Sequence, residues 1–356
     1  MLTTALEIPA TLDGIDTDWL TAALSSRYPG TVVTGMHRAR LISGTGTKLR
    51  VVLEYNDAGH KAGLPPTMWI KGGFDGVHNE IMAGGNAAEA IFFNQVAPSI
   101  DANVPLCHYA ATEGPAGRSV VLLEDLLIRN VTFGRATEPM SVDTVRAALD
   151  LQASYHATWW DRDSELLDGV TTGAPWLYGA IMHLLEKPNW DELTTRRAEI
   201  IPAPLRDRDR VVAASETWFE WEKTGTHTLL HGDPHIGNWY FERDGRPGLL
   251  DWQVVNRGIY THDVTYLMVS ALTVTDRRNH GDELLRYYLE RLAAHGVANP
   301  PTFDEAMLDH RRDIMHGFWW AVTPSTMQPE DICWVTTERY AAAAHDLDML
   351  EALESF

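Results

Sequence analysis

One polar segment, HGDPHIGN at residues 231–238, constrains this chain more than any other stretch of its sequence. Apolar and aromatic runs flank it, and a turn at Asp244–Gly245 leads into a further apolar run that ends at Asp251. This pattern predicts a strand, a tight polar loop, a strand, a hairpin turn and a last strand. We therefore expect Asp233, Asn238 and Asp251 to meet at one edge of a small sheet.

The residues expected at this edge offer two carboxylates and an amide oxygen. Oxygen donors of this kind suit a hard cation such as Mg²⁺, and one carboxylate remains as a base. The chemistry indicated is phosphoryl transfer, in which catalysis consists mainly of positioning and of neutralising charge. An ordinary polar turn with solvated carboxylates is the alternative, but the flanking strands favour the functional interpretation.

The segment resembles the catalytic segment of the aminoglycoside phosphotransferase and choline kinase-like superfamily, which comprises small-molecule kinases with a protein-kinase-like fold. The resemblance rests on His231, Gly232, Asp233 and Asn238 at fixed spacing, followed by Asp251. It implies that Asp233 orients the acceptor hydroxyl and accepts its proton. It also implies that Asn238 and Asp251 hold Mg²⁺ against the phosphates of ATP, the co-substrate.

Three further residues near the segment have supporting roles in this interpretation. We expect His231 to orient the loop and His235, which lies inside it, to be structural. Asp263 belongs to GIYTHDV at 258–264, which resembles a segment of the same kinases. We expect its carboxylate to cap a helix or to accept backbone N–H bonds from the catalytic loop.

A glycine-containing turn lies upstream, between strands predicted at 31–42 and 48–55. The turn contains Ser43, Gly44, Thr45 and Gly46. Glycine allows the backbone to approach a ligand closely, and successive amides can bind phosphate oxygens. By itself such a turn is more often a plain hairpin, but upstream of the catalytic segment it resembles the phosphate-covering loop of these kinases.

A third predicted strand, Thr67–Gly73, carries Lys71 after an apolar pair. A lysine in such a strand is costly to bury without a partner, and the resemblance implies that Lys71 binds the α- and β-phosphates. Its partner acid should lie on the following helix, predicted at Asn86–Ala97. We prefer Glu89, in the interior of that helix, over Glu80, which lies earlier in the chain.

Two more strands, predicted at 104–110 and 119–123, complete a five-stranded antiparallel lobe. Glu124 and Leu126 follow in a segment that resembles the hinge whose backbone binds adenine. The chain is thus predicted to have an α+β, bilobal, protein-kinase-like fold. Its parts would be a nucleotide-binding lobe with an N-terminal helix at 1–123, a hinge and linker at 124–140, and a mainly helical catalytic and substrate-binding lobe at 141–356.

Composition and net charge limit the classes of partner that we expect this protein to bind. The formal net charge of −20 argues against a nucleic-acid binder, which needs a basic surface, and mildly favours a cationic small molecule. No apolar run reaches membrane-spanning length, and the N-terminus lacks a signal-peptide pattern, so we expect a cytoplasmic protein without a membrane partner. Cys107 and Cys333 lie far apart in the sequence, which indicates buried thiols in a reducing compartment.

The leading interpretation is an ATP-dependent kinase that phosphorylates a hydroxyl of a small molecule, with an amino sugar, an aminoglycoside-like compound or an amino alcohol favoured. The stretches DWQ at 251–253 and DVTY at 263–266 look as much like the ecdysteroid-kinase-like branch, which phosphorylates bulky apolar alcohols. Trp252 and Gln253 replace the Phe-Gly of protein kinases, which counts against a protein kinase. A non-catalytic nucleotide-binding sensor or scaffold is the alternative of another class.

Overall fold

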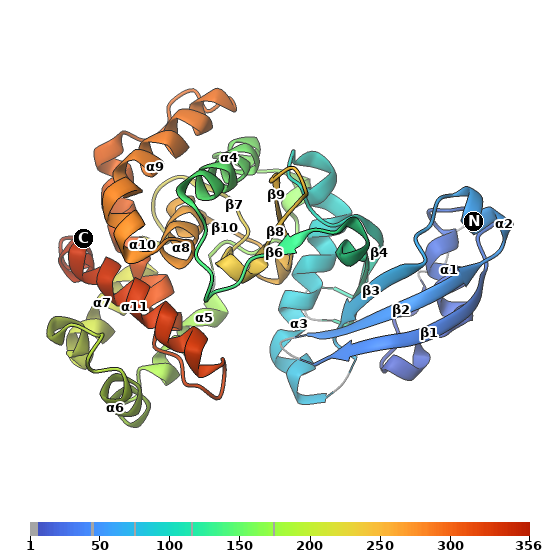
Figure 1. Cartoon of the computed structure of the whole chain (residues 1–356), viewed down its shortest axis with the longest axis horizontal. Coiled ribbons are helices and arrows are strands. Elements are labelled where there is room, and N and C mark those ends of the chain that lie inside the picture. The colour runs from blue at the N-terminus through green and yellow to red at the C-terminus, as the bar shows by residue number, and fades with distance from the viewer. Residues whose placement is uncertain (1–5, 44–45, 75, 115–116, 174) are drawn as a thin grey trace.

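The N-terminal part of the chain is built on a five-stranded antiparallel sheet with the order β1-β2-β3-β5-β4. The computed structural model describes residues 6–43, 46–74, 76–114, 117–173 and 175–356, and their side chains except those of 76–82, 175 and 176. The strands are β1 (Val33–Ile42), β2 (Thr47–Tyr55), β3 (Thr67–Gly72), β4 (Cys107–Thr112) and β5 (Ser119–Glu124). Two helices, α1 (Thr17–Ser25) and α2 (Asp57–Lys61), accompany the sheet (Figure 1).

The side chains of β2 alternate between buried positions and positions that are at least partly exposed. Leu49, Val51 and Leu53 are buried in a hydrophobic cluster that also contains Leu20 and Leu24 of α1. Because successive side chains of a strand point to opposite faces, the intervening residues of β2 point away from this cluster. One face of the strand therefore packs on α1, and the other is left for polar side chains.

The C-terminal part is mainly helical and shares one large hydrophobic core. Figure 1 shows α3 (Gly76–Ile91) between the sheet and this helical part. The C-terminal helices are α4 (Val142–Trp159), α5 (Pro175–Leu184), α6 (Lys187–Arg196), α7 (Arg208–Trp221), α8 (Thr261–Ala271), α9 (Val274–Ala294), α10 (Phe303–Ala321), α11 (Glu330–Asp346) and α12 (Met349–Glu354). The predicted α+β, bilobal fold class is confirmed. None of the helices in the described ranges is long and apolar enough to cross a bilayer.

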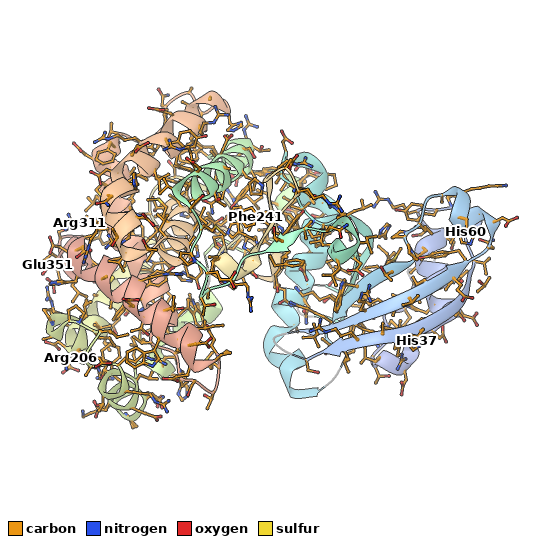
Figure 2. The ribbon with its side chains drawn as sticks, in the orientation of Figure 1. His37, His60, Arg206, Phe241, Arg311 and Glu351 are labelled. Atoms are coloured by element: carbon orange, nitrogen blue, oxygen red, sulfur yellow. The ribbon has the colours of Figure 1, made fainter. Side chains whose placement is uncertain are left out.

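The strands around residues 231–238 form two small sheets, so the prediction of a single sheet is wrong. β7 (His227–Leu230) pairs with β10 (Asn256–Ile259), while β8 (Trp239–Phe241) pairs with β6 (Thr132–Phe133) and β9 (Pro247–Leu249). Figure 2 shows Phe241, the last residue of β8, in the middle of the molecule.

The separation of the two small sheets begins at Gly232. This glycine has a φ of 82°, a conformation that disfavours other residues, and a Cβ there would lie 2.3 Å from the carbonyl oxygen of Val254. The chain can therefore leave β7 in a tight turn and pass directly against the segment that precedes β10. The close approach between distant segments explains why the local pattern did not predict this arrangement.

Close packing of α10 on α11 makes one glycine sensitive to substitution. A Cβ on Gly317 would lie 1.8 Å from a ring carbon of Tyr340, whereas nothing lies within 4 Å of a Cβ on Gly281 in α9. We expect Gly317→Ala to lower the free energy of unfolding by about 1–3 kcal/mol through overpacking. Gly281→Ala should be neutral or stabilise by up to about 1 kcal/mol. Urea denaturation of both variants checks this, and equal stabilities would contradict the described packing.

Candidate active site

Lys71 of β3 lies between two carboxylates that come from distant parts of the chain. Its Nζ is 2.8 Å from the carboxylate of Glu89 on α3 and 2.5 Å from Oδ1 of Asp251, which follows β9. Burial lowers the pKa of Lys71, but Asp251 and Glu89 outweigh burial and hold that pKa above its ordinary value. Glu89 is thus the acid in contact with the lysine, while the side chain of Glu80 lies outside the described residues.

A second lysine, Lys48 of β2, contacts the same carboxylate, and sequence reasoning missed it. Its Nζ is 2.8 Å from Oδ2 of Asp251. Lys48 pairs with Lys71 across the two strands, a register that no local pattern encodes. Burial raises the pKa of Asp251, but the charges of the two lysines hold it well below its ordinary value. Asp251 itself has a left-handed backbone with a φ of 68°.

Asp233 and Asn238 lie next to each other in the loop that precedes β8. The side-chain amide of Asn238 donates to the carbonyl oxygen of Asp233 at 2.7 Å and lies 3.4 Å from its Oδ2. The backbone N–H of Leu250 donates to the carbonyl of Asn238, which places Asn238 close to Asp251. Burial raises the pKa of Asp233 to about 6, opposed by the charge of His235. A carboxyl with such a pKa suits a general base near neutral pH.

Asp263, near the start of α8, holds the turn between β7 and residues 233–238, the predicted catalytic loop. Its carboxylate accepts bonds from the backbone N–H groups of His231 at 2.7 Å and Gly232 at 3.0 Å, and from the hydroxyl of Tyr155 at 2.6 Å. The side chain is fully buried. Burial alone would raise the pKa of Asp263, but the hydrogen bond and charge of His156 help to lower it to about 2.

The two histidines of the loop are bonded to the loop itself. Nε2 of His231 lies 3.0 Å from the carbonyl oxygen of Leu250, and its Nδ1 accepts from the backbone N–H of Asp233. Burial lowers the pKa of His231 to about 4, so its ring is neutral. Nδ1 of His235 accepts from the backbone N–H of Gly237, and its Nε2 is 3.8 Å from the carboxylate of Asp233.

Trp252, directly after Asp251, is packed among three aromatic rings. Its ring is stacked on Phe92 at 3.9 Å between centroids, with 8° between the planes. The rings of His231 and Tyr155 lie 4.6 and 5.6 Å away. The indole is fully buried. Phe92 begins a π-helical turn, Phe92–Val96, that continues α3, so the helix that carries Glu89 is packed against the residue next to Asp251.

The glycine-containing turn approaches this cluster at its C-terminal end. Ser43 is exposed and Gly46 is buried, while Gly44 and Thr45 lie outside the described residues. A Cβ on Gly46 would lie 3.0 Å from Nε2 of Gln253 and 3.3 Å from Oδ1 of Asn86. Nε2 of Gln253 donates to that oxygen at 2.6 Å. Sequence reasoning missed this contact because the two amides are distant in the chain.

The segment after β5 is fixed by its side chains. The carboxylate of Glu124 accepts from the backbone N–H of Leu106 at 2.8 Å and from Arg129 at 2.6 Å. Arg129 also pairs with Glu242, just after β8. Leu126 is buried in the following 3₁₀ turn. The Glu124 carboxylate therefore has protein partners, and its backbone N–H donates to the carbonyl oxygen of Leu106 at 2.9 Å.

The side-chain oxygens of Asn238 and Asp251 fit Mg²⁺ if phosphate oxygens and water complete the coordination of the ion. Within the described part of the chain, no three His, Cys, Asp or Glu side chains are grouped to hold a metal by themselves. Asn238 directs its NH₂ group to Asp233, so its oxygen can serve a cation. Asp251, which contacts two lysines in the structure, would supply a carboxylate oxygen. Magnesium sites commonly combine one or two protein oxygens with substrate phosphates and water.

Comparisons with known proteins give one matching family model and several similar folds. A model of the ecdysteroid kinase-like family matches residues 186–297, which include the catalytic segment, Asp251 and Asp263. A spectinomycin phosphotransferase, solved with ADP and spectinomycin, has a TM-score of 0.54 and 12% sequence identity, with 94% of this chain and 99% of that chain covered. A protein of Ralstonia eutropha assigned as an aminoglycoside phosphotransferase has a TM-score of 0.52 and 14% identity, with 96% and 98% covered.

At these identities the similarity to solved structures shows the fold, which is that of protein-kinase-like phosphotransferases of small molecules. The predicted resemblance to this superfamily is confirmed at that level, and the family model extends it to the segment that carries the candidate site. No curated protein sequence matches the chain.

Proposed function

We propose that this protein is an ATP-dependent kinase that transfers the γ-phosphate to a hydroxyl group of a small molecule, with Mg²⁺ as cofactor. The observation that carries the proposal is the contact of Lys71 with both Glu89 and Asp251. A buried lysine held by one acid and aimed at a second, next to an Asp-Asn pair, supplies the charges that phosphoryl transfer needs.

In this proposal Asp233 binds the acceptor hydroxyl and takes its proton as the phosphoryl group is transferred. Asn238 and Asp251 hold Mg²⁺, which would neutralise charge on the phosphates. Lys71 binds the α- and β-phosphates. The segment Ser43, Gly44, Thr45 and Gly46, predicted from the sequence as the phosphate-covering loop, would cover the phosphates, and the backbone from Glu124 to Leu126 would bind adenine.

ADP release from Mg-ATP, measured over a panel of acceptors, tests the proposal. The panel contains amino sugars, amino alcohols, neutral sugars and sterol-like alcohols, with a water-only control for ATP hydrolysis. We expect acceptor-dependent ADP release with at least one class. ATP binding without acceptor-dependent release on any class would favour the non-catalytic sensor or scaffold.

The family match, together with aromatic rings near Asp233, adds a bulky apolar alcohol to the cationic acceptors suggested by the net charge. The ring of His235 lies 6.3 Å from that of Tyr266, which is close to Asp233. The ring of His316 is 5.1 Å from Tyr266, and Trp320 donates to His316. Tyr266 and His316 are buried, so the match to the ecdysteroid kinase-like family is the main support for an apolar alcohol. Amino sugars and amino alcohols are the competing acceptors in the panel.

Loss of the Lys71 charge should impair the use of ATP. We expect Lys71→Met to lower kcat/KM for ATP by about 100-fold, because a charge that faces the phosphates is removed from an enclosed site. Lys61→Met, on the exposed end of α2, is the matched control and should leave kcat/KM unchanged. Thermal melts confirm that both variants fold. A folded Lys71→Met variant with normal kcat/KM would argue against this role.

We also propose that the protein acts in the cytoplasm. Cys107 and Cys333 are both free thiols in the structure. Burial raises the pKa of each, to about 12 for Cys107, which keeps the thiols in their unreactive protonated form. Fluorescence microscopy of a tagged protein in its native cell checks the location.

A further inference from the structure

Two lysines share a single carboxylate at the candidate site. Lys48 and Lys71 lie directly opposite each other on β2 and β3, so both side chains project from the same face of the sheet. Like charges directly opposite one another are destabilising unless an anion lies between them. Asp251 is that anion, with one oxygen on each lysine, at 2.8 Å from Lys48 and 2.5 Å from Lys71.

The two lysines differ in what remains when Asp251 turns to another ligand. Lys71 keeps Glu89 at 2.8 Å, and both of these side chains are buried. For Lys48, no carboxylate of the described residues other than Asp251 lies within ion-pair distance, and its side chain is 32% exposed. Once a cation occupies the oxygens of Asp251, Lys48 needs a new anion. The phosphates that accompany that cation are the anions at hand.

A second observation beside the glycine-containing turn also points to an anion. The side-chain amide of Asn86 accepts from Gln253, but its own Nδ2 is buried without a hydrogen-bond partner in the described structure. A buried donor without a partner is costly. Gly46 separates this amide from Lys71, since a Cβ on Gly46 would lie 3.3 Å from Asn86 Oδ1 and 3.8 Å from Lys71 Cε. A ligand oxygen within reach of Asn86 Nδ2 would satisfy the donor.

We propose that Lys48 is a second phosphate-binding lysine, which binds Asp251 in the free protein and a β- or γ-phosphate oxygen in the complex with Mg-nucleotide. The proposal rests on the kinase function proposed above and adds to it a residue from outside the predicted phosphate-binding set. The ligand class is a nucleoside di- or triphosphate. Lys48 thereby exchanges one anion for another, whereas Lys71 keeps Glu89 throughout.

Isothermal titration calorimetry with Mg-ATP, Mg-ADP and adenosine tests the proposal without reference to turnover. We expect Lys48→Met to weaken binding of Mg-ATP by about 10-fold, in line with the loss of one charged contact, and to leave adenosine binding unchanged. Lys48→Arg should recover most of the affinity because it restores the charge. Lys61→Met, the exposed-lysine control on α2, should bind all three ligands as the unmodified protein does.

The outcomes separate this inference from the function on which it rests. If the unmodified protein binds Mg-ATP and Lys48→Met binds it equally or more tightly, Lys48 only ties down Asp251 and the inference is overturned. If the unmodified protein binds neither Mg-ATP nor Mg-ADP, the proposed function itself fails. Should Lys48→Met not fold, Lys48→Gln provides the same comparison, and equal losses for adenosine and ATP would also contradict a phosphate contact.

Discussion

Asp233→Asn is expected to lower kcat for acceptor phosphorylation by about 1,000-fold, because general-base catalysis by a positioned side chain contributes roughly 10²–10⁴-fold. The substitution keeps the size of the side chain and its place beside Asn238. It removes the group that would take the hydroxyl proton. Initial rates of ADP release at saturating Mg-ATP and acceptor provide the measurement.

Measuring the affinity for Mg-ATP shows whether Asp233→Asn affects the chemical step rather than nucleotide binding. The Kd of Mg-ATP should stay within about twofold of its original value, since Asp233 is not assigned to the nucleotide. Asp244→Asn, in the exposed turn between β8 and β9, is the matched control and should retain full kcat. A loss of less than about 10-fold in the Asp233 variant would show that another group is the base.

Asp263→Ala should have the largest effect on stability. Its carboxylate is fully buried and accepts from His231, Gly232 and Tyr155, so removal leaves three buried donors without a partner. Breaking a buried charged network of this kind costs about 3–5 kcal/mol of the free energy of unfolding. Urea denaturation measures it, and Asp282→Ala, exposed on α9, is the control.

Acid denaturation distinguishes the stability contributed by the charge of Asp263 from the stability contributed by the packing of its side chain. Its pKa in the folded protein is about 2, below the ordinary value, so the stabilisation from its ionised form is complete above about pH 4. That stabilisation, roughly 2–3 kcal/mol, is lost as pH falls toward 2. Asp263→Asn should lose less stability between pH 5 and pH 3 than the unmodified protein. Identical slopes would contradict the assigned charge.

Local sequence patterns predicted the parts of this fold that depend on neighbouring residues. The five strands of the first sheet, the helix with Glu89 and the order of the site residues all follow from periodicity, turns and family resemblance. The short helix α2 was not predicted, because five residues carry too little periodicity. The pairing of β7 with β10 was also not predicted, because the loop, β8 and β9 lie between these two strands in the sequence.

In the candidate site, too, some residues could be predicted from local sequence patterns and others could not. Lys71 and Glu89 could be proposed from the sequence because each stands in a recognisable element. Lys48 has no such signal, since its role depends on the strand register opposite Lys71. The contact between Asn86 and Gln253 depends on how α3 approaches the residues after Asp251, which only the folded chain determines. Local patterns thus indicate which groups are present, and long-range packing decides which of them meet.

The packing of Trp252 bears on how such an enzyme would be controlled. Rotation of the Asp251 side chain alone leaves Trp252 in place, whereas a displacement of the Asp251–Trp252 backbone would draw the indole out from between Phe92, Tyr155 and His231. Losing the packing of a buried aromatic side chain costs about 3–5 kcal/mol, which corresponds to a displaced population below roughly one per cent. We therefore expect an enzyme that is constitutively active once folded. Its output would follow the amount of protein and the supply of acceptor rather than a signal received at this loop.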